Sequence, residues 1–199
     1  MGSGREARAS ILRAAKGLFV RFGFKKTSIE DIARAARIGK GSVYLHFRSK
    51  EEIFAEVVRE ASDRMLEALV TAVERAHTPA DKLRDFLGAK LTTLAEIAAD
   101  HHLGEEAVIE LLPLAKSLRQ AHVERERSLL REILREGVSS NAFAVSHLDL
   151  LESGLMTLLG ALETSTLALR DFTGTRAGLD EVISVLIGGM SATPRRRDN

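Results

Sequence analysis

Apolar residues recur every three or four positions along almost the whole chain of 199 residues, which is the spacing of one face of an α-helix. Valine, isoleucine, threonine and tyrosine nowhere alternate with polar residues over the length of a strand. The sequence therefore predicts an all-α protein of about nine helices. The expected helices cover residues 5–22, 28–36, 40–45, 50–76, 79–99 and 103–112, a segment ending at 136, and residues 146–171 and 175–190.

Residues with strong terminal preferences mark the ends of these helices. Gly23 is expected to end the first helix, and Gly137 to cap the segment that ends at 136. Ser49 suits the N-cap of the fourth helix, with Glu52 at the capping-box position, and Pro79 suits the first turn of the fifth. The expected core stripe of the first helix consists of Ile11, Leu12, Ala15, Leu18, Phe19 and Phe22.

Residues 27–50 predict two short helices joined by a tight turn. Thr27 or Ser28 is expected to cap the first of them, and either can offer hydroxyl and backbone N–H groups to a phosphate. In the second, the small Gly41 allows close approach to an edge of the major groove. The expected inward residues are Ile29, Ile32, Ala33, Ala36, Ile38, Val43 and Phe47. The expected exposed residues of the second helix are all hydrogen-bond donors, namely Lys40, Ser42, Tyr44 and His46.

Positive charge is concentrated in the same part of the chain. Residues 1–50 carry 12 lysines and arginines against 3 acidic residues, a net charge of +9, whereas residues 51–199 carry a net charge of −8. A compact basic head on an acidic body is typical of a nucleic-acid-binding protein. Charge alone is equally compatible with a solvated basic surface.

The order of residues in this segment resembles the N-terminal domain of the tetracycline-repressor (TetR) family of bacterial regulators. The matching stretches are residues 27–33, which read Thr-x-x-x-Asp-Ile-Ala, residues 40–47, which read Lys-Gly-x-Val-Tyr-x-His-Phe, and residues 49–54, which read Ser-Lys-Glu-Glu-Ile-Phe. The resemblance implies that the helix at 40–45 enters the major groove of DNA. The expected DNA-contacting residues are Thr27, Ser28, Arg37, Lys40, Gly41, Ser42, Tyr44, His46 and Lys50.

Two residues of the turn depart from the family pattern. Arg37 stands where the family usually has glycine. Because an arginine tolerates a left-handed backbone poorly, we expect the turn to shift its backbone strain away from this position. Gly39 stands where serine or threonine often caps the recognition helix, and glycine is the weaker cap. Arg37 is also expected to add a DNA contact.

The resemblance extends more weakly over the whole chain and implies two domains: a DNA-binding head of residues 1–50 and an effector-binding and dimerisation domain of residues 51–199. The helix at 146–171 is apolar on nearly every side, which favours burial in a homodimer. A two-fold dimer would present its recognition helices roughly 34 Å apart to a palindromic operator. The expected dimer contacts are Leu151, Leu155, Leu158, Leu162, Leu179, Val182 and Leu186.

In TetR-type proteins the body also encloses a ligand pocket whose filling moves the fourth helix and separates the heads. Residues 51–199 contain no tryptophan and no tyrosine, so we expect an aliphatic pocket and an acyl-chain or other lipophilic effector. The same side chains would equally serve as ordinary core. The expected pocket residues are Phe86, Lys90, Leu94, His122 and Met156.

Several other classes of function find no support in the sequence. The absence of cysteine excludes disulfides and zinc–thiolate sites, and no phosphate-binding loop or catalytic set stands out. His101 and His102 are adjacent and so point apart, which argues against a metal site. We therefore expect no catalytic residue, no metal and no cofactor. We also expect no signal peptide and no membrane span, and a cytoplasmic location.

Two alternatives remain open beside the ligand-gated repressor. One is an activator, or an effector-independent DNA-binding protein, of the same fold. The other is an enzyme that has kept a helical shell, which the missing catalytic motifs disfavour.

Overall fold

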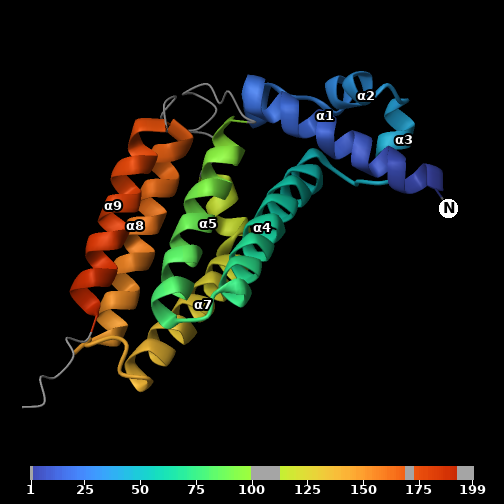
Figure 1. Cartoon of the computed structure of the whole chain (residues 1–199). Helices are drawn as coiled ribbons and strands as arrows, with labels where there is room; N and C mark the ends of the chain where they lie inside the picture. Colours follow the sequence, from blue (N-terminus) through green and yellow to red (C-terminus); the bar gives the residue numbers. More distant parts are fainter. Residues whose placement is uncertain (1, 100–112, 169–172, 192–199) are drawn as a thin grey trace, which may run out of the picture. The chain divides into compact units, whose positions relative to one another are not determined.

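The computed structural model describes residues 2–99, 113–168 and 173–191 and is all-α over these ranges, as predicted (Figure 1). Within them no β-strand forms, although an isolated bridge joins Phe143 to Ser191. Residues 113–118 are also helical, and the helix expected at 103–112 lies outside the described residues. The helices are α1 (Gly2–Lys26), α2 (Ile29–Ala36), α3 (Lys40–Tyr44), α4 (Lys50–Arg75), α5 (Pro79–Ala99), α7 (Gln120–Ser139), α8 (Leu148–Ala168) and α9 (Thr173–Met190).

The chain divides into two compact units. The first comprises residues 1–64 and 96–121, and the second comprises residues 65–95 and 122–199. Helix α4 contributes to both units, and the domain boundary expected at residue 50 stays a prediction. Over the described residues, no helix combines the length and the apolar content that crossing a membrane requires.

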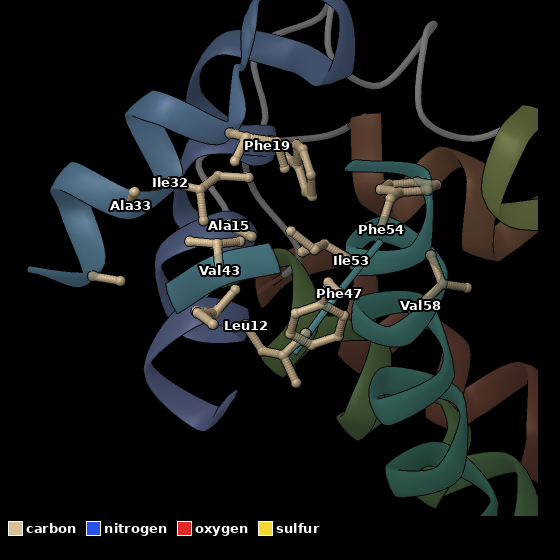
Figure 2. Close-up of a cluster of buried hydrophobic side chains, with 13 residues drawn as sticks. Leu12, Ala15, Phe19, Ile32, Ala33, Val43, Phe47, Ile53, Phe54 and Val58 are labelled. Atoms are coloured by element: carbon tan, nitrogen blue, oxygen red, sulfur yellow. The ribbon is translucent and has the colours of Figure 1, made fainter. Parts of the chain in front are cut away.

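Side chains from α1, α2, α3 and α4 converge on the core of the first unit (Figure 2). The predicted core residues Ile32, Val43 and Phe47 are all buried there. Burying a side chain of this size contributes about 1.5–3 kcal/mol. The recognition segment is therefore held to the rest of the unit by its own apolar residues. The core comprises Ile11, Leu12, Ala15, Phe19, Ile29, Ile32, Ala33, Ala36, Val43, Phe47, Ile53, Phe54 and Val58.

Helix α1 is interrupted at Gly23, which has φ 81° and ψ 167°. This left-handed region of φ favours glycine, so the sequence correctly identified the residue at which the helix breaks. The prediction that Phe22 lies in the core was wrong, because Phe22 is exposed and the break turns Phe24 inward instead. The Phe24 ring lies 5.6 Å from that of Phe19 and 5.3 Å from that of Phe54.

The predicted starts of α4 and α5 are confirmed. The Ser49 hydroxyl accepts the backbone N–H of Glu52 at 3.2 Å, although the Glu52 carboxylate accepts the N–H of Arg48 rather than that of Ser49. Helix α5 begins at Pro79, and the Thr78 hydroxyl accepts the N–H of Asp81 at 3.1 Å.

Ion pairs connect α5, α7 and α8 within the second unit. Lys82 on α5 reaches Glu136 on α7 at 2.7 Å. Arg131 on α7 donates to the buried carboxylate of Glu152 on α8, with Nη2 and Oε1 2.8 Å apart. The pKa of Glu152 is lowered, first by this hydrogen bond from Arg131, so the buried group remains charged.

Gly137 does not cap α7, contrary to the prediction. Helix α7 continues to Ser139, and the left-handed residue after it is Asn141, with φ 58°. Gly137 is buried inside the helix, and a Cβ atom there would lie 1.9 Å from Cδ2 of Phe143. Glycine is therefore needed at this position for the close approach of an aromatic ring.

Candidate DNA interface

Ser28 fixes the first residue of α2 through a reciprocal cap. Its hydroxyl oxygen accepts the N–H of Asp31 at 3.2 Å, and the Asp31 carboxylate accepts the Ser28 N–H at 3.2 Å. The Ser28 hydroxyl also donates to Asp31 at 2.6 Å, and this bond is the first cause of the lowered pKa of that carboxyl. Of the two N-caps considered from the sequence, the structure uses Ser28.

The turn between α2 and α3 is closed by Arg37 in the left-handed conformation, with φ 58° and ψ 41°. The Arg37 N–H donates to the carbonyl of Arg34, and the Ile38 N–H donates to that of Ala33 at 3.0 Å. This is the pair of bonds of a Schellman motif, in which glycine normally occupies the left-handed position. The expectation that strain would be shifted was wrong, because Arg37 adopts the conformation that glycine would have.

The short helix α3 presents polar groups around a single buried anchor, Val43. Gly39 precedes the helix in an extended conformation and makes no side-chain cap. Gly41 is exposed, and a Cβ atom added there would meet nothing within 4 Å. Lys40 and Tyr44 are exposed, and Ser42 and His46 are half-buried.

Leu45 belongs to the same surface and was not identified from the sequence. It is 83% exposed, directly after α3 and between Tyr44 and His46. The buried pair Val43 and Phe47, four residues apart, leaves the intervening positions outside the core, and this spacing was the available signal. An exposed leucine at this position can contact the methyl group of thymine.

Thr27 and Lys50 lie together where α1 meets α2. The Thr27 side chain is buried, and its hydroxyl donates to the carbonyl of Gly23 at 2.8 Å. The Lys50 ammonium donates to the carbonyls of Phe24 and Thr27, at 2.7 and 2.9 Å. In this structure, two residues expected to contact phosphate hold the connection between the helices.

The remaining predicted residues lie in the second unit. Among the expected pocket residues, Phe86, Lys90 and Leu94 are buried, and His122 and Met156 are half-buried. The Lys90 ammonium pairs with Glu126, and the Glu163 carboxylate lies 3.9 Å away. Of the expected dimer contacts, Leu155 is buried within its own chain and Leu158 and Val182 are exposed. The half-buried ones are Leu151, Leu162, Leu179 and Leu186.

No metal site is evident in the part of the chain that the structure covers, because no three His, Cys, Asp or Glu side chains gather there in a suitable arrangement. His101 and His102 lie outside this part.

Residues 11–57 match the family model described as bacterial regulatory proteins, tetR family. This stretch contains the capped α2, the Arg37 turn, α3 and the start of α4. The chain belongs to the TetR family. It is accordingly a transcriptional regulator of a DNA-binding family, and the predicted recognition is confirmed.

Relatives of this TetR-family protein are found among regulators of bacterial genes. It is 28% identical over 137 residues to the HTH-type transcriptional repressor KstR2 of Mycolicibacterium smegmatis, covering 68% of this chain and 67% of the relative. It is 27% identical to the fatty acid metabolism regulator protein of Bacillus subtilis, covering 65% and 67% of the two chains. The solved structure of the TetR-family regulator PfmR from Thermus thermophilus superposes with a TM-score of 0.64, at 27% identity, over 94% of this chain and 99% of that one.

Proposed function

We propose that this TetR-family regulator is a homodimeric repressor that binds a palindromic operator and is released by a small lipophilic effector. The observation that carries the proposal is the surface of α3, where Gly41 leaves open space beside the exposed Lys40. A surface of this kind suits the floor of the major groove, because lysine can donate to O6 and N7 of guanine.

The proposed roles of the polar residues follow from their positions. Lys40, Gly41 and Ser42 begin α3 and would face the bases, whereas Tyr44 and His46 would donate to phosphates. Ser28 would offer the backbone N–H groups at the start of α2, and Arg37 would add a cation beside the turn. Thr27 and Lys50 would contribute by holding the connection between α1 and α2, Lys50 through its hydrogen bonds to two backbone carbonyls.

An exposed apolar face on α8 and α9 supports the dimer. Leu158 and Val182 are 62% and 61% exposed in the single chain, and Leu150 and Val185 are more exposed still. Exposed apolar surface of this extent usually marks an interface. The face continues at exposed small residues, and Cβ atoms at its glycines would meet nothing within 4 Å, so a second copy of the chain could approach closely. These small residues are Gly154, Ala161, Gly178 and Gly189.

A lipophilic effector is supported by the character of the second unit and by the relatives. Phe86 and Leu94 on α5 are buried on either side of Lys90, whose ammonium pairs with the buried carboxylate of Glu126, so apolar side chains and a polar pair stand together as a ligand with an apolar body and a polar end would require. One relative is named a fatty acid metabolism regulator protein. We extend this only to the class of compound, a molecule with an acyl chain or a similar lipophilic body.

Selection from a random pool of DNA duplexes tests the proposal. The purified protein should enrich an approximate palindrome whose half-sites are one helical turn apart, and fatty acids or acyl thioesters of increasing chain length should release it. Failure to retain any duplex at low salt would overturn the DNA-binding proposal. Binding that no compound of the series weakens would favour an activator or an effector-independent protein of the same fold.

A further inference from the structure

An acidic residue lies on the surface expected to meet DNA. Glu30 is in the first turn of α2, and its carboxylate forms an ion pair with the ammonium of Lys40, the first residue of α3. The Lys40 ammonium also lies 6.0 Å from the centroid of the Tyr44 ring. Glu30 therefore contacts the lysine proposed to read a base.

This pair offers little to the stability of the fold. The side chains of Lys40 and Glu30 are 51% and 52% exposed, and ion pairs this accessible contribute little in water. The pKa of Glu30 is lowered, first by the hydrogen bond from Lys40, and the pKa of Lys40 is raised, first by the hydrogen bond to Glu30. Both groups are thus charged at neutral pH, and a carboxylate remains where phosphates are expected.

A carboxylate at this position affects the two modes of DNA binding differently. Non-specific binding depends on cations that reach phosphates, and Glu30 both repels phosphates and occupies Lys40. Specific binding depends on donors at the base edges, and an ammonium has three donors. Lys40 can therefore keep Glu30 and still donate to both O6 and N7 of guanine.

We propose that Glu30 is a specificity-determining residue, which weakens non-specific binding more than operator binding by holding Lys40 away from phosphates. This inference rests on the proposed function, since it needs α3 to read bases. The Glu30 carboxylate would widen the difference in affinity between operator and non-specific DNA by disfavouring the non-specific complex.

The test compares wild type and Glu30→Gln on two duplexes of equal length, the selected operator and a random-sequence duplex, over a range of salt concentrations. We expect non-specific binding to tighten about two- to five-fold and operator binding to change less, so that the ratio of affinities falls. If Lys40 gains one phosphate, the non-specific log–log salt slope steepens by about 0.9. Glu60→Gln, which removes the same charge from an exposed position on α4, should leave the ratio unchanged.

A double-mutant cycle with Lys40→Gln checks that the effect passes through the lysine. In that background Glu30→Gln should change the ratio of affinities clearly less than in the wild type, because only the direct repulsion of phosphates is left to remove, and thermal unfolding should show that each variant is folded. Equal tightening on both duplexes, or no change on either, overturns the inference and leaves the proposed function standing. A wild-type protein that binds no duplex at all overturns both.

Discussion

The ammonium of Lys50 lies 4.3 Å from the centroid of the Phe24 ring. From this position it donates to the backbone carbonyls of Phe24 and Thr27, so the first residue of α4 is connected to the end of α1. Phe24 in turn packs against Phe54, one turn along α4 from Lys50. The start of α4 and the end of α1 are therefore held together at one structural joint, formed by Phe24, Thr27, Lys50 and Phe54.

Replacement of Lys50 by methionine tests the strength of this joint. The variant keeps an unbranched apolar stem but leaves two carbonyls without their charged donor, and we expect it to lower the free energy of unfolding by about 1–3 kcal/mol. Urea denaturation gives the value. Arg48→Met, at an exposed position two residues earlier, is the matched control and should be close to neutral. Equal stability of the Lys50 variant and the wild type would show that the joint is unimportant.

The left-handed Arg37 predicts a stabilising substitution. Arg37→Gly removes the steric cost of the Cβ atom at φ 58°, and we expect a gain of about 0.5–1 kcal/mol in the free energy of unfolding. Arg37→Ala removes the same charge and keeps the strain, so it should not stabilise. If Arg37 contacts DNA, both variants should weaken operator binding equally. A stabilised alanine variant would contradict the attribution to backbone strain.

Replacement of Gly41 by alanine is expected to raise the stability of the fold and to weaken operator binding. Gly41→Ala adds a Cβ atom that meets nothing in the free protein, and the lower conformational entropy of the unfolded chain should raise stability by about 0.5 kcal/mol. The same atom would stand between α3 and the bases and should weaken operator binding. Gly17→Ala on α1, where a Cβ atom also meets nothing, should stabilise without changing DNA affinity. Unchanged operator affinity in Gly41→Ala would argue against close approach of α3.

The apolar face of α8 and α9 predicts the effect of a charge on assembly. Leu158→Glu should give a folded monomer, because the added carboxylate would be buried by the second copy of the chain without a partner. Sedimentation measures the oligomeric state, and circular dichroism measures the helix content. Ser139→Glu adds the same charge at the end of α7 and should leave the dimer intact. If the Leu158 variant remained dimeric, the dimer interface would have to lie outside this face of α8 and α9.

Much of the fold could be predicted because periodicity and terminal residues act locally. The caps at Ser28 and Ser49 and the inward residues Ile32 and Val43 depend only on neighbours in the sequence. The use of Gly137 could not be predicted from the sequence around it. Its small size is required by a ring six residues later, and nothing in helical spacing specifies where that ring returns.

The site was predictable as a segment and less so as a set of contacts. The pattern around α3 gave its exposed donors, whereas the pairing of Glu30 with Lys40 depends on how α2 and α3 are brought together across the turn. Phe22 was wrongly assigned to the core, because the turn of the chain at Gly23 depends on its left-handed φ and brings Phe24 against Phe19 and Phe54 instead.

The central claim, that α3 reads bases in both halves of a two-fold complex, is tested most directly by repeating the duplex selection with Lys40→Ala. The account predicts that the variant still selects an approximate palindrome with the same spacing of half-sites. It also predicts that the base preference is relaxed at one symmetric position in each half, because the lysine donor to that base edge is gone. Selection of the same sequence with unchanged preference at every position would contradict the account.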